Sequence, residues 1–293
     1  MNRNTIRVPA RIRGAGLLVA VVLALGACSA PAASSAPSGE AGSPVIGDGT
    51  LLDRIKAAGL IRVANPQTSP PYSLRNEANE VAGFDVDFAN ELAERMGIAE
   101  VEFIQGTFDT FIPGVETDKW DVVIAGQAIT EERKLKVDFS IPYRVSKVSI
   151  FVNESDDTIE TLEDLEGKRI AIPAGASQLK MAEEVEGAEI KSYENATLAL
   201  TDVGLGRADG YLGSRFVGLY LAQQSGLKVK PTDAVLELEQ NAMSFKKGEA
   251  AFKAEADRII MEMIADGTLK ALSEKWFGPT EDMGKEVSDI LGS

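Results

Sequence analysis

The sequence predicts an α/β fold with parallel sheets, because strand and helix patterns alternate along most of its length. Residues 121–125 form a run of β-branched and small apolar residues after one aspartate, which is typical of a central strand buried on both faces. Residues 84–96 repeat an apolar side chain at every fourth position, which places these side chains on one face of a helix. Repeated strand–helix units of this kind form parallel sheets covered by helices.

The first half of the globular region supplies three strands and two helices. Residues 60–64 and 101–104 are short apolar runs that suit strands, and they flank the helix at 84–96, which Gly97 ends. Residues 108–115 have a helical pattern but contain Pro113, so we expect this helix to be short or to begin near the proline.

The second half repeats the alternation, and no internal sequence repeat is evident. Strands are expected at residues 169–172, 209–212 and 242–245. Helices are expected at residues 177–185, 198–205, 215–224, 249–264 and 269–276. The globular region is therefore expected to extend from Thr50 to about Gly278.

The N-terminal segment is interpreted as a targeting signal. Residues 1–13 carry four arginines, residues 14–27 are uncharged, and the single cysteine, Cys28, follows Leu25-Gly26-Ala27. This arrangement resembles the lipobox of bacterial lipoproteins, in which the cysteine is acylated and becomes the new N-terminus. A retained membrane helix and an ordinary cleaved signal are the alternatives, but the strongly apolar stretch is shorter than the roughly 20 residues that a spanning helix needs.

Composition excludes several classes of function. Residues 29–49 are rich in Ala, Ser, Pro and Gly and are expected to form a flexible tether. The formal net charge of −15 argues against nucleic-acid binding and suits a monomeric exported protein. The sequence contains no histidine, which removes Ser-His-Asp catalysis and histidine metal sites, and no cofactor or metal is implied.

An ordered set of motifs resembles one known family. The motifs are IRV at 61–63, PPY at 70–72, GFDVD at 83–87, FDTFIP at 108–113, DVVIAGQAITEER at 121–133, FSIPY at 139–143, LEDLEGKR at 162–169, GRAD at 206–209 and ADGT at 265–268. Together they are similar to the extracellular solute-binding proteins, family 3, which serve polar amino-acid ABC transporters. The resemblance covers nearly all of residues 51–278.

The resemblance implies a two-lobed periplasmic-binding-protein fold, known as the Venus-flytrap fold, in which parallel-rich sheets flank a hinged cleft. The expected division is 1–27 signal peptide, 28–49 tether, 50–144 first part of lobe 1, 145–239 lobe 2, and 240–293 return to lobe 1. The hinges would lie near residues 144–147 and 236–241. Closure would be absorbed by these few residues.

Candidate ligand contacts from lobe 1 follow the strand at 121–125. Gly126 has no side chain, so a ligand can approach its backbone, and Thr130 can cap a short helix that begins at Glu131. Arg133 would lie in the first turn of that helix, and its planar guanidinium matches a carboxylate. The resemblance implies that Arg133 grips the α-carboxylate of the ligand and that Gly126 and Ala128 hold the amino acid through their backbone.

From lobe 2, Ser177 and Gln178 lie where a strand leads into a helix, and a helix N-terminus suits an anion. Ser177 is expected both to cap that helix and to donate to the ligand carboxylate. Phe108 and Tyr72 are expected on the cleft wall, and the alternative for each is a place in the core of lobe 1.

Two positions depart from the family pattern. Ser214 stands where relatives commonly carry an aspartate for the ligand ammonium, and Ser69 replaces an aromatic residue before the two prolines. A buried ammonium without an anion is costly. Either another acid substitutes, with Glu239 as the first candidate, or the ligand is not an ordinary α-amino acid. Arg215 is a weaker candidate for a second ligand carboxylate.

The resemblance implies a monomeric binding protein, anchored by lipid on the outer side of a membrane, that delivers an amino acid or related small carboxylate to ABC permease subunits. A ligand-binding domain of a receptor is one alternative. An enzyme similar to cyclohexadienyl dehydratases is another, although the sequence marks no catalytic carboxylate. No nucleic-acid partner is expected.

Overall fold

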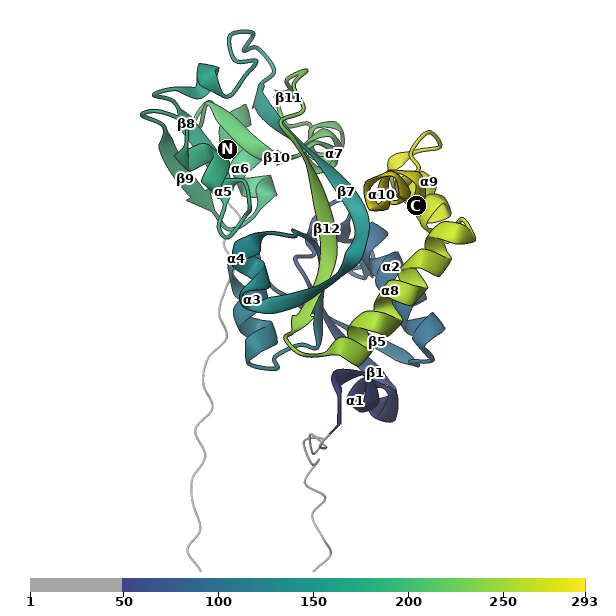
Figure 1. The fold of residues 1–293 in the computed structure, drawn as a ribbon. Coiled ribbons are helices and arrows are strands. Elements are labelled where there is room, and N and C mark those ends of the chain that lie inside the picture. Colours follow the sequence, from purple (N-terminus) through teal and green to yellow (C-terminus); the bar gives the residue numbers. More distant parts are fainter. Residues whose placement is uncertain (1–48, 293) are drawn as a thin grey trace, which may run out of the picture. The chain divides into compact units, whose positions relative to one another are not determined.

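Two long antiparallel strands form the middle of the fold. The computed structural model describes residues 49–292, which belong to one compact unit. Strands β7 (Val137–Asn153) and β12 (Glu237–Lys246) pair along their length and curve together between the two lobes, as Figure 1 shows. Glu239 lies opposite Ser146, and Asn241 opposite Arg144. The expected hinge segments, 144–147 and 236–241, fall within or next to these two strands.

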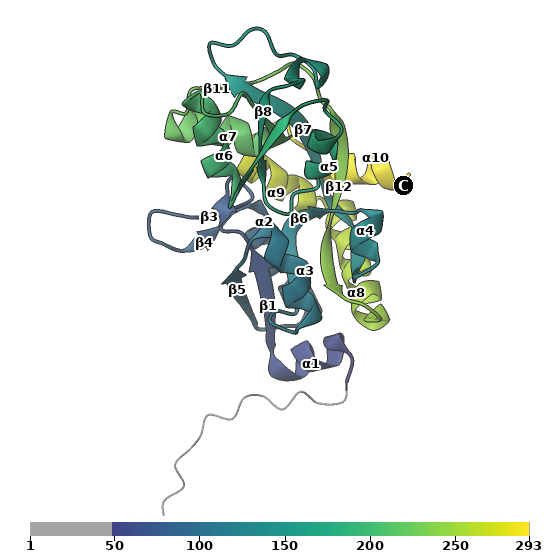
Figure 2. The same cartoon turned by 90° about the vertical axis from the view of Figure 1, so that its left-hand side faces the viewer.

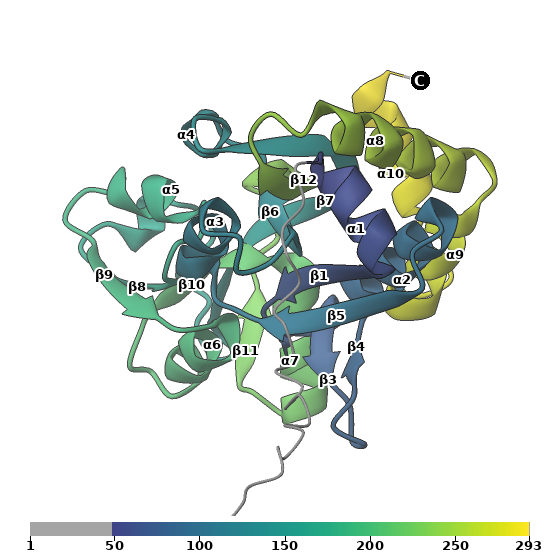
Figure 3. The same ribbon diagram turned by 90° about the horizontal axis from the view of Figure 1, so that it is seen from below.

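Lobe 1 is built on three parallel strands beside β12. Strands β1 (Leu60–Asn65), β5 (Glu100–Gln105) and β6 (Val122–Ala128) lie in the order β5-β1-β6. The helices of this lobe are α1 (Leu51–Ala58), α2 (Phe84–Met96), α3 (Phe108–Glu116), α8 (Ala250–Ala265) and α9 (Thr268–Phe277). Seen from below, α1 lies beside β1 and α8 (Figure 3).

Alternating residues of β6 explain why its run is apolar throughout. Val122 and Ile124 pack into the core that includes Phe88 of α2, whereas Val123 and Ala125 pack into a second core around Trp120. Side chains on a strand point alternately to opposite faces, so a strand covered on both faces has no polar side. The expected central strand is confirmed and extends three residues further, through Gly126 to Ala128.

Lobe 2 repeats this plan at the other end of β7. Its parallel strands β8 (Arg169–Pro173), β9 (Glu189–Tyr193) and β10 (Gly210–Ser214) lie in the order β10-β8-β9. Strand β11 (Val229–Pro231) pairs with β7. The helices are η1 (Glu163–Leu165), α5 (Leu179–Glu183), α6 (Ala196–Gly204) and α7 (Arg215–Ser225). Figure 2 shows α6 and α7 above a hairpin of lobe 1 formed by β3 (Ser73–Arg75) and β4 (Val81–Ala82).

Smaller elements complete lobe 1. Strands β2 (Thr68–Ser69), β3 (Ser73–Arg75) and β4 (Val81–Ala82) form a separate sheet, and α4 (Glu131–Lys134) follows β6. Helix α10 (Met283–Leu291) packs on β7 and α9, with Met283 and Val287 buried. The expectation that the globular region ends near Gly278 is therefore wrong, because this amphipathic last helix contributes to the core.

Two helices differ from their predicted bounds. Helix α3 runs from Phe108 through Pro113 to Glu116, because Thr107 and Thr110 form a capping box and Phe111 and Val115 bury one face. Helix α5 is shorter than expected and begins at Leu179. Ser177 does not cap it, since the residue at the N-cap is Gln178 and no side chain accepts a capping bond.

Each lobe contains its own arginine–aspartate clamp, which joins two neighbouring parallel strands. Arg62, on β1, donates from its backbone N, its Nε and its Nη2 to the carboxylate of Asp121, at 2.8, 3.1 and 2.7 Å. Arg169, on β8, makes the same three bonds to Asp209, at 2.8, 2.9 and 2.6 Å. Each clamp connects an arginine near the start of one parallel strand to the aspartate that directly precedes the neighbouring parallel strand. The two lobes therefore follow one structural plan despite dissimilar sequences.

Among residues 49–292, no helix combines the length and the apolar composition that are required to cross a membrane. The predicted signal peptide, Cys28 and almost all of the tether lie outside the described residues.

We predict that Asp121→Ala lowers the free energy of unfolding by about 1–2 kcal/mol, because three donors of a partly exposed arginine lose their acceptor. Urea denaturation measures this change. Asp289→Ala is the control, since its ion pair with Lys285 lies on the surface of α10, and we expect little change. Equal stability of the two variants would contradict a structural role for the clamp.

Candidate functional site

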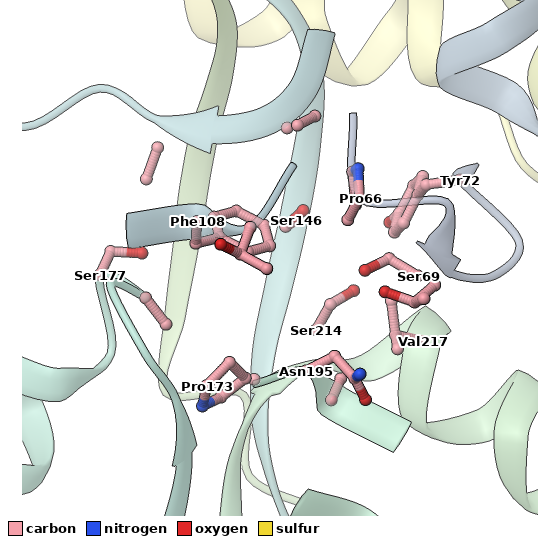
Figure 4. A pocket seen from close by; sticks show the side chains of 18 of the residues that line it. Pro66, Ser69, Tyr72, Phe108, Ser146, Pro173, Ser177, Asn195, Ser214 and Val217 are labelled. Carbon is pink, nitrogen blue, oxygen red and sulfur yellow. The ribbon is translucent and has the colours of Figure 1, made fainter. Parts of the chain in front are cut away.

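A pocket lies between the two lobes and has a cavity volume of about 90 Å³. Lobe 1 contributes Phe108 and Arg133, lobe 2 contributes Ser177 and Ser214, and the crossing strands contribute further polar side chains. Figure 4 shows Ser177 on one side of the pocket and Tyr72, Ser69 and Ser214 on the other. Of the predicted contacts, the pocket wall contains Tyr72, Phe108, Gly126, Ala128, Arg133, Ser177, Gln178 and Ser214.

Arg133 spans the gap between the lobes. Its Nη1 donates to the carbonyl O of Ala128 at 2.9 Å, and its Nη2 donates to the carbonyl O of Gly175, in lobe 2, at 2.9 Å. Burial lowers the pKa of Arg133, and the nearby carboxylate of Glu239 opposes this effect. Its partners in hydrogen bonds are neutral carbonyls, so the guanidinium can still bind an anion.

Thr130 positions Arg133 but does not line this pocket. The Oγ1 of Thr130 accepts a hydrogen bond from the backbone N of Arg133 at 3.2 Å, so Thr130 caps α4 as expected. Its side chain lies instead on a more open groove, whose wall also includes Ser177 and Glu239. Thr130 therefore lies outside the wall of the central pocket, although Ala128 and Ser177 line both the pocket and this groove.

The pocket wall contains an exposed acid, Glu194, and a buried one, Glu239. The Oε1 of Glu239 accepts hydrogen bonds from Ser177 Oγ at 2.5 Å and from Gln178 Nε2 at 2.9 Å. Burial raises the pKa of Glu239, whereas the hydrogen bond from Ser177 lowers it. The Ser177 hydroxyl therefore reaches a strand far away in the sequence rather than its own helix.

A buried ion pair lies below Gly126. The Nε of Arg144 is 3.2 Å from Oδ1 of Asp85, and the guanidinium stacks on the ring of Tyr72, 3.6 Å from its centroid. Burial raises the pKa of Asp85 to about 6, although the charge of Arg144 opposes this shift. A Cβ on Gly126 would lie 1.5 Å from Nη2 of Arg144, so this glycine, with its φ of +60°, is required for packing.

Two buried hydroxyl groups in the pocket wall make no well-aligned hydrogen bond with any residue in the range 49–292. These are Tyr72 Oη and Ser214 Oγ, and both atoms are buried. Burial raises the pKa of Tyr72, whereas Arg144, Ser214 and Ser146 each lower it, so these side chains lie close together. Tyr72 also packs on Phe84, so it belongs to the core of lobe 1 and to the pocket wall.

The remaining sequence candidates are placed as follows. Phe108 is half-buried, lines the pocket and packs edge-on against Phe111. Ser69 lines the pocket beside Tyr72 (Figure 4). Arg215 does not line it, because its Nη1 donates to the carbonyl O of Thr232 at 2.9 Å and to Ser149 Oγ at 3.2 Å. The suggestion that Arg215 meets a ligand carboxylate is therefore wrong.

Sequence reasoning missed Arg144, Ser146 and Tyr211, which also line the pocket. A signal for the first two was present, since Arg144 and Ser146 lie two residues apart directly after the FSIPY motif. On a strand, residues two apart share a face. Among residues 49–292, no group of three or more acidic, cysteine or histidine side chains is placed to hold a metal ion.

Comparisons with known proteins agree on the family. The family model of the bacterial extracellular solute-binding proteins, family 3, matches residues 61–279. The L-cystine-binding protein TcyJ of Escherichia coli (strain K12) is 31% identical over 233 residues, which cover 79% of this chain and 87% of that protein.

Two solved structures share the fold at higher identity. An ancestral arginine-binding protein bound to arginine has a TM-score of 0.72 and 35% identity, with 75% of this chain and 99% of that chain covered. An ancestral amino acid-binding protein, a precursor of cyclohexadienyl dehydratase, has a TM-score of 0.71 and 33% identity, with 78% and 100% covered. The chain belongs to the bacterial extracellular solute-binding proteins, family 3, and has their two-lobed fold.

Proposed function

We propose that this protein binds an amino acid or a related small carboxylate outside the cytoplasm and delivers it to an ABC importer. The observation that carries the proposal is a pocket between two lobes in which the guanidinium of Arg133 donates to two neutral carbonyl oxygens. The relatives of this chain include L-cystine-binding and arginine-binding proteins, which supports an amino acid as the ligand.

The ligand carboxylate would meet Arg133 and donors from both lobes. A guanidinium gains two parallel, charge-assisted bonds when a carboxylate replaces neutral carbonyl oxygens. Gln178 lies on the facing lobe and has a second amide N–H to offer, whereas the single hydroxyl hydrogen of Ser177 is held by Glu239. The backbone of Gly126 and Ala128 lies on the side of Arg133. A ligand held from both lobes favours the closed arrangement, because only that arrangement makes both sets of contacts.

Glu239 would take the ligand ammonium. Ser214 supplies a hydroxyl without charge, and Glu239 is the buried carboxylate in the pocket wall. Its second oxygen, Oε2, makes no hydrogen bond among the described residues, so it can accept from an ammonium while Oε1 keeps Ser177 and Gln178. Under this proposal, an ordinary α-amino group is compatible with the departure at Ser214.

The other predicted residues would shape the pocket. Phe108 and Tyr72 would form its apolar walls, and Thr130 would act through the cap that orients Arg133. We infer lobes of residues 50–144 with 240–293, and 145–239, with bending inside β7 and β12. From the proposed role in an ABC importer, we also infer that the protein is a monomer and that its partners are ABC permease subunits.

Binding rather than catalysis is the function that we infer. The relatives described above are binding proteins, although one solved neighbour is a precursor of a dehydratase. Glu239 is held by two donors from Ser177 and Gln178, which suits recognition of a cation better than proton transfer. Incubation with cyclohexadienyl substrates tests the enzyme directly, and the presence of permease and ATPase genes nearby separates import from sensing.

We predict that Arg133→Ala weakens binding of the best amino-acid ligand by about 30-fold to several thousand-fold, because the ligand carboxylate loses its cation. Calorimetry measures the affinity after a thermal-shift screen has identified that ligand. Arg258→Ala, on the surface of α8, is the matched control and should bind normally. A loss of less than about threefold, with circular dichroism unchanged, would assign Arg133 a structural role.

We predict that Glu239→Gln lowers affinity for a free α-amino acid at least about tenfold at neutral pH, because an amide cannot balance the ammonium charge. Burial raises the pKa of Glu239, so its carboxylate is lost at a higher pH than in an ordinary glutamate. Affinity of the wild type should therefore fall as the pH is lowered through that raised pKa, and this dependence should disappear in Glu239→Gln.

The control for Glu239 is Glu237→Gln, which changes an exposed acid two residues away on the same strand. Calorimetry should show nearly wild-type affinity for Glu237→Gln at neutral pH. Its pH dependence should remain but move to lower pH, because the charge of Glu237 raises the pKa of Glu239. If both glutamine variants bind equally well, Glu239 does not recognise the ammonium.

We also propose that residues 1–27 are removed as a signal peptide and that Cys28 carries the lipid anchor. We predict that Cys28→Ser releases the protein from the membrane or leaves the precursor uncleaved, because serine lacks the acylated thiol. Fractionation and immunoblotting measure retention and size. Ser29→Ala is the control, and normal processing of Cys28→Ser would contradict the anchor.

A further inference from the structure

Four polar side chains cluster at the end of the pocket away from Ser177. They are Arg144 and Ser146 of β7, Tyr72 of the loop before β3, and Ser214 at the end of β10, and we call them the acceptor subsite. Figure 4 shows Tyr72 and Ser214 opposite Ser177, with Phe108 between them in this view. The ligand contacts proposed above, Arg133, Gln178 and Glu239, are not part of this cluster.

The cation of the subsite is fixed in place. Arg144 is 4% exposed, its Nη1 donates to Ser146 Oγ at 2.7 Å, and Ser146 Oγ donates to Asn241 Oδ1 at 2.5 Å. Stacking on Tyr72 and the ion pair with Asp85 hold the other parts of the guanidinium. Asp85 is not part of the pocket wall, so the cation faces the cavity and its counter-ion does not.

Two of the three hydroxyl groups of the subsite, those of Tyr72 and Ser214, have hydrogens without a well-aligned acceptor in the part of the chain that the structure describes, whereas Ser146 donates to Asn241. Burial raises the pKa of Tyr72, and Tyr72 and Ser214 lie close enough together for Ser214 to lower it. Both oxygen atoms are buried. Buried polar groups in folded proteins nearly always have a partner, so each exception requires an explanation. A ligand atom that accepts hydrogen bonds would satisfy both hydroxyls at once.

The end of a helix reinforces the same preference. Ser214 occupies the N-cap of α7, an eleven-residue helix, but its side chain makes no capping hydrogen bond. The first backbone N–H groups of a helix have no acceptor within the helix, and they give its N-terminus a partial positive charge. Cation, hydroxyl donors and helix end therefore all favour an oxygen acceptor and disfavour a second positive charge.

We propose that the acceptor subsite binds a side-chain carboxyl or carboxamide oxygen, so that the ligands are acidic amino acids or their amides. This inference rests on the proposed amino-acid binding. With Arg133 on the α-carboxylate and Glu239 on the ammonium, the side chain of the ligand extends toward Arg144. An apolar side chain leaves the hydroxyls unpaired, and a basic side chain meets a buried cation.

The first experiment compares side chains on the wild-type protein by calorimetry. The panel is aspartate, asparagine, glutamate and glutamine, with norvaline as the apolar analogue and ornithine as the basic one. We expect the best acid or amide to bind at least about tenfold more tightly than norvaline, and ornithine to bind weakest. Glutamate against glutamine, and aspartate against asparagine, distinguish a charged acceptor from a neutral one.

The second experiment removes single hydroxyl groups. Tyr72→Phe keeps the ring against Arg144, and Ser214→Ala removes a side chain that makes no capping hydrogen bond to α7. Neither substitution should therefore lower the Tm of the free protein. Each should reduce the affinity ratio of the best acid or amide to norvaline by about tenfold. Tyr220→Phe, on the side of α7 that lines a different groove, is the matched control and should keep the ratio.

A third variant reverses the charge of the subsite. Ser214→Asp places a carboxylate beside Arg144, so it should weaken glutamate and strengthen ornithine by Coulomb attraction. Norvaline binding as tightly as every acid and amide, or an unchanged ratio in both hydroxyl variants, would overturn the acceptor subsite alone. Failure of the wild type to bind any amino acid would overturn the proposed function, and the inference with it.

Discussion

The buried pair of Asp85 and Arg144 is the constraint on which the base of the pocket depends. Asp85 lies in the first turn of α2, and Arg144 lies on β7. The hydroxyl of Tyr143 connects this pair to β6, because it donates to Asp85 Oδ1 and accepts from the backbone N of Gly126, both at 2.9 Å. The network continues from Arg144 to Asn241 on β12. Removing one partner of such a pair costs about 3–5 kcal/mol, because a charge is left buried without compensation. Helix, pocket floor and both crossing strands are therefore fixed by one set of charges, and a ligand meets a surface that is already organised.

Features set by short stretches of sequence were predictable. Helix α2 has the bounds that its four-residue spacing and Gly97 indicate, and the cap of α4 by Thr130 places Arg133 where the spacing requires. Both depend on neighbours within a few residues, so local geometry decides them. The resemblance to a known family supplied the two-lobed arrangement, and the family model and the solved structures confirm it. Roles of individual site residues stay predictions until binding is measured.

Features set by distant partners were not predictable. The pattern at Ser177 indicated a helix cap, but α5 begins two residues later, and the hydroxyl donates to Glu239, 62 residues further along the chain. Strand β7 was missed because Pro142 and the polar residues around Arg144 interrupt its alternation, and pairing with β12 outweighs that weak local preference. The register that puts Arg144 opposite Asn241 depends on this long-range pairing. Sequence reasoning therefore located residues at both ends of the pocket but missed the buried cation, Arg144, at one of them.

The aromatic contact between the lobes has a thermal consequence. Phe216 of α7 stacks on Phe277 of α9 at 4.8 Å, and Tyr72 meets both rings edge-on. Any opening that parts α7 from α9 brings these rings into contact with water, and hydration of apolar surface raises heat capacity. The closed form therefore has the lower heat capacity, and the enthalpy of closure becomes more favourable as temperature rises. Cooling weakens this apolar contact but leaves the ion pair between Asp85 and Arg144 in place. Temperature therefore affects the separation of the lobes more than it affects the shape of the site.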